Sequence, residues 1–190
     1  GKLLDQIKQQ QAFLLKNLRL QVRVIALTNS KKMVFNEDGI DLEKWKLQLD
    51  KGEKLNMDLF HEKVTDLNFR NSIFVDNTAS ENVSKLYASY LKESVAVVTC
   101  NKIACSSNYT NYLNLKQLAR EYNAPFLFET NVGAGLPIID TLKNLIASGD
   151  KVSKIQAVLS GSLNFVFNNF NDKTSFSEVV NQAGIQGYTE

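Results

Sequence analysis

The 190-residue sequence contains one histidine, two cysteines, two prolines and no long uninterrupted run of apolar residues. A structural zinc site needs four Cys or His ligands, so His61, Cys100 and Cys105 are too few to form one. A membrane-spanning helix needs roughly 18 consecutive apolar residues, and the first residues lack the pattern of a signal peptide. We therefore expect a cytoplasmic protein without a membrane partner, in which both thiols are buried and reduced.

The sequence also lacks a strong charge of either sign. Its formal net charge is +2, and the basic residues are scattered rather than clustered, which argues against nucleic acid as a partner. Hydrophobic residues make up 44% of the chain and charged residues 22%, as in ordinary globular proteins. At this length we expect one domain or one and a fraction, with a core that needs no disulfide or metal.

Helical periodicity alternates with short apolar runs along the first two thirds of the chain. We expect helices over residues 2–18, 41–66 (two helices, broken near Gly52), 81–93 and 108–122, and strands over residues 20–27, 72–76, 95–98 and 125–128. Wholly apolar strands that alternate with helices favour parallel βαβ units with both sheet faces covered.

Polar residues follow three of these strands, as Thr28–Ser30, Asn77–Ser80 and Asn101–Lys102. Ligands of parallel α/β sheets bind at the carboxyl ends of the strands, so these turns are the first candidates for a binding site. Thr78 fits either a helix cap or a phosphate contact. Lys102 is either a solvated lysine or an ammonium group that stabilises charge on a reacting oxygen.

The pattern changes after Phe128, where Glu129–Pro137 forms a glycine-bearing loop. We expect a domain boundary there, then a helix (138–147), a strand (152–159), a turn at residues 160–162 and two further helices. The aromatic side chains of residues 165, 167 and 170 are expected in the core, and His61 is expected to be structural. The predicted fold is a doubly wound, Rossmann-like parallel sheet followed by the start of an α+β domain, which the family resemblance described below implies to be the substrate and dimerisation domain.

The beginning of the sequence bears on the same fold. Gly1 directly precedes a predicted helix, which is the place of the third glycine in G-x-G-x-x-G, where helix and strand pack closely. A doubly wound sheet that begins with a helix lacks its first strand. We therefore expect a fragment: a partial cofactor domain over residues 1–128 and the first part of a second domain over 129–190.

Three segments carry a family likeness: Val75–Ser80, Glu129–Pro137, and Ser160–Asn164 together with Gly187–Glu190. They resemble homoserine dehydrogenase, and the whole chain is similar to the dehydrogenase part of bifunctional aspartokinase–homoserine dehydrogenases. The resemblance implies interconversion of L-homoserine and L-aspartate 4-semialdehyde with NADP or NAD, in threonine and methionine biosynthesis. It also implies a homo-oligomer formed through the second domain.

The resemblance also implies roles for individual residues. Thr78 and Lys102 match cofactor contacts, with Gly187 at the cofactor's edge, and Gly1 and Thr28 are the further cofactor candidates. Lys102 is also implied to be catalytic. Glu190 matches the carboxylate that holds the substrate's amino group, and it is our second catalytic candidate.

A substrate contact and an ion site complete the implied set. Ser162 falls in the turn that lines the substrate pocket. A monovalent cation, Na⁺ or K⁺, is implied at Glu129, Val132, Ala134 and Leu136, mostly through backbone carbonyls. A second catalytic lysine of the family lies in a run that follows residue 190, so the 190 residues alone are expected to be inactive.

Other interpretations stay open at this point. One is a non-enzymatic nucleotide-binding or regulatory α/β domain, and another is an unrelated dehydrogenase that acts on a different aldehyde or keto acid. The choice between NAD and NADP is also open, although Lys31 and Lys32 favour NADP.

Overall fold

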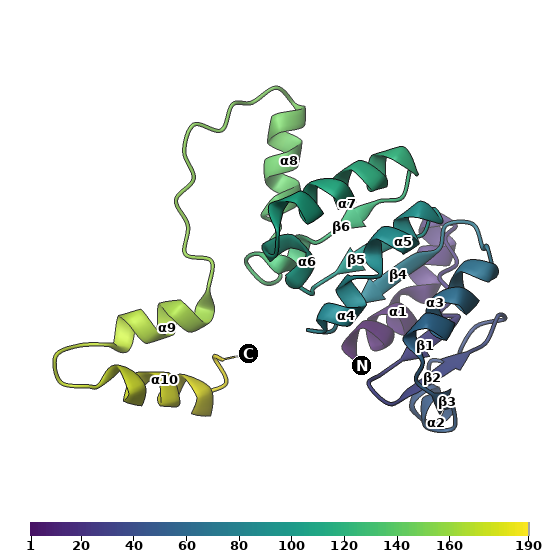
Figure 1. Cartoon of the computed structure of the whole chain (residues 1–190), viewed down its shortest axis with the longest axis horizontal. Coiled ribbons are helices and arrows are strands. Elements are labelled where there is room, and N and C mark those ends of the chain that lie inside the picture. The colour runs from purple at the N-terminus through teal and green to yellow at the C-terminus, as the bar shows by residue number, and fades with distance from the viewer. Residues whose placement is uncertain (190) are drawn as a thin grey trace.

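The computed structural model describes residues 1–189, and its centre is a three-stranded parallel sheet (Figure 1). The strands are β4 (Ile73–Asp76), β5 (Ala96–Thr99) and β6 (Phe126–Leu127), in the order β4-β5-β6. Asp76 pairs with Thr99 at the carboxyl ends of the first two strands. The apolar runs at residues 72–76, 95–98 and 125–128 therefore form the predicted parallel strands.

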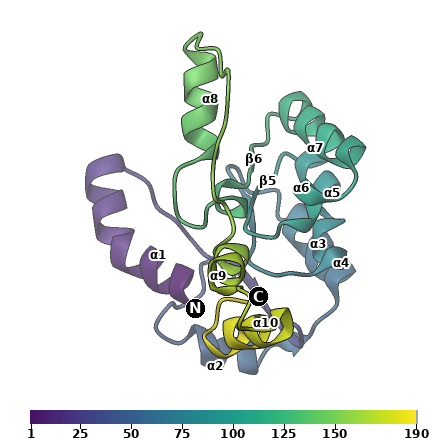
Figure 2. The same cartoon turned by 90° about the vertical axis from the view of Figure 1, so that its left-hand side faces the viewer.

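Short helices connect these strands and cover the sheet. They are α4 (Glu81–Ser84), α5 (Tyr87–Lys92), α6 (Ile103–Ser106) and α7 (Tyr109–Glu121). The helix expected over residues 81–93 is therefore divided in two. Figures 1 and 2 place α5 and α7 on one side of the sheet and α1 (Lys2–Phe13) on the other. Tyr87, Tyr90, Leu91 and Val97 are fully buried between the sheet and its helices. These βαβ units confirm the α/β class.

A second sheet corrects the prediction for residues 20–27. Only Ala26–Thr28 forms a strand (β1), and it pairs antiparallel with β2 (Lys32–Phe35), which pairs antiparallel with β3 (Glu53–Lys54). The Asn29 side chain accepts the backbone N–H groups of Lys31 and Lys32, each at 2.8 Å. This turn reverses the chain directly after β1, so the strand joins a hairpin instead of the parallel sheet.

The remaining N-terminal elements match the expected helices. α1 continues into a π-helical turn, η1 (Leu14–Leu18), and none of its residues is buried. α2 (Trp45–Asp50) and α3 (Met57–Asp66) are the two helices expected around Gly52. His61 on α3 hydrogen-bonds Ser89 of α5, and its ring lies 4.6 Å from that of Tyr90, which is a structural arrangement.

Within the described residues, the chain after β6 forms helices and no strands. They are the 3-10 turn η2 (Glu129–Asn131), α8 (Ile139–Ala147), α9 (Gly161–Asn169) and α10 (Phe176–Ile185). The strand expected over residues 152–159 is not formed, and Val158 there is 77% exposed. Figure 1 shows this segment as a long extended connection that holds α9 and α10 apart from the sheet. An apolar run without a neighbouring strand has no partner for its backbone groups, so it stays irregular.

Two expectations about burial are wrong in part. Phe167 and Phe170 are exposed by 64% and 48%, and the small core between α9 and α10 consists of Val166, Val179 and Ala183 with Phe165 packed against it. Cys100 is exposed and Cys105 is half-buried, so the thiols are not both enclosed. None of the helices in residues 1–189 is long and apolar enough to cross a membrane.

Candidate functional site

Two polar turns lie side by side at the carboxyl edge of the parallel sheet. Because Asp76 and Thr99 are paired at the ends of β4 and β5, the turns that follow leave the sheet at the same level. Thr78 stands two residues beyond the end of β4, and Lys102 stands three residues beyond the end of β5. Both side chains are exposed. The turns that carry Thr78 and Lys102 therefore lie at the same edge of the sheet, where the sequence predicts them.

A buried polar network lies directly beneath these turns. The Asp76 carboxylate, 1% exposed, accepts hydrogen bonds from the Tyr87 hydroxyl at 2.5 Å, the Asn101 side-chain amide at 3.0 Å and the backbone N–H of Thr78 at 2.7 Å. The Thr99 hydroxyl lies 2.8 Å from the Tyr87 hydroxyl and accepts the backbone N–H of Asn101 at 2.8 Å. Each polar group is therefore satisfied inside the protein, as burial requires.

The ionisation of Tyr87 follows from this setting. Burial raises the pKa of the Tyr87 phenol far above its usual range, and the hydrogen bond to Asp76 raises the pKa further, while the bond to Thr99 lowers it. The phenol therefore stays protonated and donates a hydrogen bond to the Asp76 carboxylate. Sequence reasoning missed this network, although Asp76, a charged residue at the end of an apolar strand, was a signal of it.

The turn after β4 is fixed mainly by local bonds. The Thr78 hydroxyl accepts the backbone N–H of Ser80 at 3.1 Å, and Ser80 caps α4 by accepting the N–H of Val83 at 3.4 Å. Ser80, and not Thr78, is therefore the residue that caps α4. Thr78 shapes the turn, and its side chain stays at the surface of the edge.

Lys102 is held through its neighbours. It stands at the N-terminal boundary of α6, and its carbonyl accepts the N–H of Ser106 at 2.9 Å. The preceding Asn101 is 2% exposed and bonds through its side chain to Asp76, the Ser80 carbonyl and the N–H of Ile103. The backbone at Lys102 is thus set by a residue that connects both turns.

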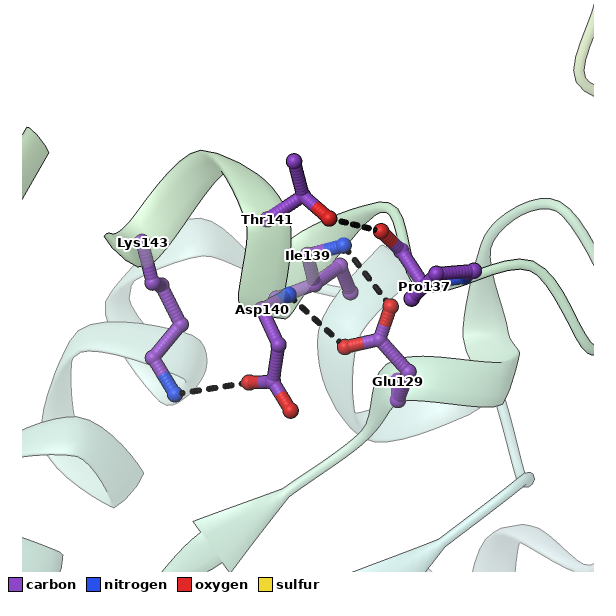
Figure 3. Close-up of polar contacts among 6 residues, drawn as sticks. All are labelled: Glu129, Pro137, Ile139, Asp140, Thr141 and Lys143. Atoms are coloured by element: carbon purple, nitrogen blue, oxygen red, sulfur yellow. Dashed lines mark hydrogen bonds and ion pairs between the residues drawn. The ribbon is translucent and has the colours of Figure 1, made fainter. Parts of the chain in front are cut away.

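The carboxylate of Glu129, at the start of the glycine loop, makes contacts that the sequence did not indicate. The two carboxylate oxygens of Glu129 accept the N–H groups of Ile139 and Asp140, each at 2.8 Å, and so cap the start of α8 (Figure 3). Gly133 and Ala134 adopt positive φ angles of 70° and 53°. Among the carbonyls of the expected ion site, that of Leu136 accepts the N–H of Ile138 at 2.9 Å. No group of three His, Cys, Asp or Glu side chains within residues 1–189 is arranged to hold a metal.

A cavity of about 190 Å³ lies between the carboxyl ends of β5 and β6 and the helix α8. Its walls are mostly apolar, with Glu129, Asp140 and Lys143 adding charge. A hollow of about 600 Å³ lies instead along the surface of α7, away from the strand ends. The smaller cavity is the one that adjoins the polar turns, since Thr99 forms part of its wall.

The other predicted site residues lie elsewhere. Thr28 is in the β1–β2 hairpin, where its hydroxyl bonds to the Lys32 carbonyl at 3.0 Å, so its expected place at the parallel sheet's edge is wrong. Gly1 precedes α1 at the chain's start. Ser162 hydrogen-bonds the Tyr188 carbonyl, which joins α9 to the segment after α10, and Gly187 stands beside it with φ 76°. Glu190 lies outside the described residues.

A parallel sheet flanked by helices, with polar turns at its carboxyl edge, defines an α/β protein of the Rossmann-like class. The family model for the homoserine dehydrogenase NAD binding domain matches residues 1–129, and the model for homoserine dehydrogenase matches residues 137–190. The chain belongs to the homoserine dehydrogenase family.

Individual relatives agree with this assignment. Bifunctional aspartokinase/homoserine dehydrogenase 1 of Arabidopsis thaliana, a chloroplastic protein, is 43% identical over 192 residues, which is 100% of this chain and 21% of the relative. The bifunctional protein of Haemophilus influenzae is 40% identical and is covered to 23%. The chain thus spans about a fifth of these relatives. A hyperthermophilic archaeal homoserine dehydrogenase in complex with NADPH has a TM-score of 0.77 and 27% identity, with 99% of this chain and 58% of that one covered.

Proposed function

We propose that this chain is part of an enzyme that interconverts L-homoserine and L-aspartate 4-semialdehyde with a nicotinamide cofactor. The observation that carries the proposal is the placement of Thr78 and Lys102 at one edge of a Rossmann-like sheet in a chain of this family. We also propose that residues 1–128 serve the cofactor and residues 129–190 begin the substrate and dimerisation domain.

The donor groups at this edge fit a nicotinamide dinucleotide. Thr78 offers a hydroxyl, and Lys102 offers a cation for phosphate or carbonyl oxygens. The cofactor supplies the hydride when it is bound. Lys102 then acts on the substrate's aldehyde oxygen: its ammonium group stabilises the negative charge that develops there and delivers a proton to that oxygen. The reverse reaction returns the proton to the lysine.

The preference for NADP rests on the turn after β1. The Lys32 side chain bonds to the Gly52 carbonyl at 3.0 Å and supports β3. Lys31 is exposed in the same turn, so it is the lysine we propose for a 2′-phosphate. The archaeal relative was solved with NADPH.

The second part of the chain would hold the substrate and an ion. We propose that Glu190 binds the substrate's ammonium group, that Ser162 lines its pocket and that Gly187 touches the cofactor's edge. We also propose a Na⁺ or K⁺ ion at Glu129 and the carbonyls of residues 132, 134 and 136. Glu129 brings one negative charge, which suits a monovalent ion, and its carboxylate oxygens have lone pairs beyond those used by α8.

The test is an assay of the full-length protein. NADPH should be oxidised when L-aspartate 4-semialdehyde is added, and NADP should be reduced when L-homoserine is added. Turnover of a different aldehyde or keto acid alone would point to another dehydrogenase. Binding of NADPH without turnover of either substrate would favour the non-enzymatic alternative.

A further inference from the structure

A buried hydroxyl connects the two turns that carry Thr78 and Lys102. Tyr87 is 0% exposed on α5, and it reaches the carboxyl ends of β4 and β5 through its hydroxyl. On one side the hydroxyl bonds to Asp76, whose second oxygen holds the N–H of Thr78. On the other side it bonds to Thr99, whose hydroxyl holds the N–H of Asn101, the residue before Lys102.

We propose that Tyr87 is a positioning residue for the reaction, which sets the Thr78 and Lys102 turns relative to each other through Asp76, Thr99 and Asn101. This inference rests on the proposed function, because it assigns to Tyr87 an effect on the cofactor and on the proton-donating lysine. The Tyr87 hydroxyl lies 2.5 Å from the Asp76 carboxylate and 2.8 Å from the Thr99 hydroxyl, so it contacts one side chain at the start of each turn. Catalysis is sensitive to small displacements of such groups.

The direction of the hydrogen bonds makes the arrangement specific. The Tyr87 phenol has one proton, which it uses in the hydrogen bond to the Asp76 carboxylate. The Thr99 hydroxyl is therefore the donor in its hydrogen bond with the phenol oxygen. The lone pairs of Thr99 are then free to accept the N–H of Asn101. Removal of the phenol oxygen takes away one donor of Asp76 and the 2.8 Å acceptor of Thr99, whose hydroxyl is left with the carbonyls of Asp76 and Asn101 at 3.4 Å and 3.5 Å, so both turns lose a restraint.

Tyr90 provides a matched control on the same helix. It is also 0% exposed, and its ring stacks on Phe74 at 4.2 Å, while the ring of Tyr87 meets Phe74 at 6.4 Å. The hydroxyl of Tyr90, however, has no hydrogen-bond partner within residues 1–189. Tyr87→Phe and Tyr90→Phe therefore remove the same atom from equally buried rings, and only the first breaks the connection between the turns.

The experiment compares these two variants in the full-length enzyme, with NADPH affinity measured by fluorescence and turnover measured with L-aspartate 4-semialdehyde. Tyr87→Phe should lower kcat by about tenfold or more and weaken NADPH binding several-fold, whereas Tyr90→Phe should leave both near the wild-type values. Thr99→Val, which keeps the side-chain shape and removes the hydroxyl, should reproduce the effect of Tyr87→Phe. If the Tyr87→Phe variant does not fold, Thr99→Val takes its place in the comparison.

A double-variant cycle separates positioning from general destabilisation. If Tyr87 acts through Lys102, Tyr87→Phe should change kcat by no more than about twofold when Lys102 is already alanine. An equal loss of kcat in both backgrounds would overturn the proposal, and so would wild-type kcat and NADPH affinity in both Tyr87→Phe and Thr99→Val. A wild-type enzyme that does not turn over the semialdehyde would overturn the proposed function itself, which is a separate outcome.

Discussion

The carboxylate of Glu129 accepts the backbone N–H of Asp140 at 2.8 Å, across a loop of ten residues (Figure 3). Its other oxygen accepts the N–H of Ile139 at the same distance, so one side chain serves two of the N–H groups that every helix start leaves without an intrahelical partner. Negative charge at a helix N-terminus is also favourable to the helix dipole. Glu129 therefore connects the end of β6 to the start of α8.

Glu129→Gln should loosen this connection, because an NH₂ group, which is a donor, replaces one of the two carboxylate oxygens that accept the N–H groups of Ile139 and Asp140, and the negative charge at the helix start is lost. We expect a loss of about 1 kcal/mol in the free energy of unfolding, the usual effect of a lost helix cap. The exposed Glu121→Gln at the end of α7 is the control and should change little. Urea denaturation measures the difference. Equal midpoints for both variants would show that the cap contributes nothing.

The proposed cation predicts a second effect of the same variant. Replacement of Na⁺ or K⁺ by a bulky organic cation should lower the activity of the full-length enzyme, and Glu129→Gln should remove that dependence, because the one negative charge of the site is lost. Steady-state rates in matched ionic strength give the answer. A wild-type rate that is the same in every salt would mean that the loop only caps α8.

Lys102→Ala in the full-length enzyme should reduce kcat by about two orders of magnitude or more, the scale of one proton-transfer or electrostatic group. Lys92→Ala, which removes an exposed lysine at the end of α5, is the matched control. A rate for Lys102→Ala within about threefold of wild type would identify Lys102 as a solvated lysine.

Gly133→Ala should destabilise the loop, while Gly135→Ala should not. Gly133 has φ +70°, and a Cβ there would lie 2.1 Å from the Ile138 side chain, whereas a Cβ at Gly135 meets nothing within 4 Å. Backbone strain of this kind costs about 1–3 kcal/mol. Thermal unfolding of the two variants should show a lower Tm for Gly133→Ala alone. Equal Tm values would mean that the loop relaxes without cost.

The two cysteines should differ in reactivity. Burial raises the pKa of the Cys105 thiol from 9.0 to about 11, with partial offset by Asn131 and Lys116, whereas Cys100 is exposed. The thiolate is the reactive form, so iodoacetamide at pH 8 should modify Cys100 well before Cys105, as followed by mass spectrometry. Cys100→Ser should abolish the fast phase. Rapid modification of Cys105 in that variant would contradict the burial of this thiol.

The same pKa gives the sign of a pH effect on stability. The folded state holds the proton of the Cys105 thiol more tightly than the unfolded state does. The contribution of this thiol to the free energy of unfolding is therefore fully present below about pH 9 and is lost as the pH rises through about 11. Tyr87 and Tyr90, whose pKa values are also raised by burial, act in the same direction at still higher pH. The free energy of unfolding should therefore fall in alkaline solution.

The sequence by itself determined the parallel sheet and the edge that carries Thr78 and Lys102. Continuous apolar runs such as residues 72–76 and 95–98 have few stable structures other than strands covered on both faces. Strands of that kind end at a common edge, so the residues that follow them are brought together by topology alone. Family-specific segments such as Glu129–Pro137 also needed no structure to be recognised.

Only the tertiary structure decided which strands pair with each other and which polar groups form hydrogen bonds with each other. Residues 20–27 and 152–159 have similar apolar patterns, but the first ends in a hairpin formed by the Asn29 turn and the second meets no strand within residues 1–189. The bonds from Tyr87 to Asp76 and from Glu129 to Asp140 span eleven residues each. Strand pairing and burial depend on distant neighbours, whereas propensity and periodicity are properties of a short stretch of chain.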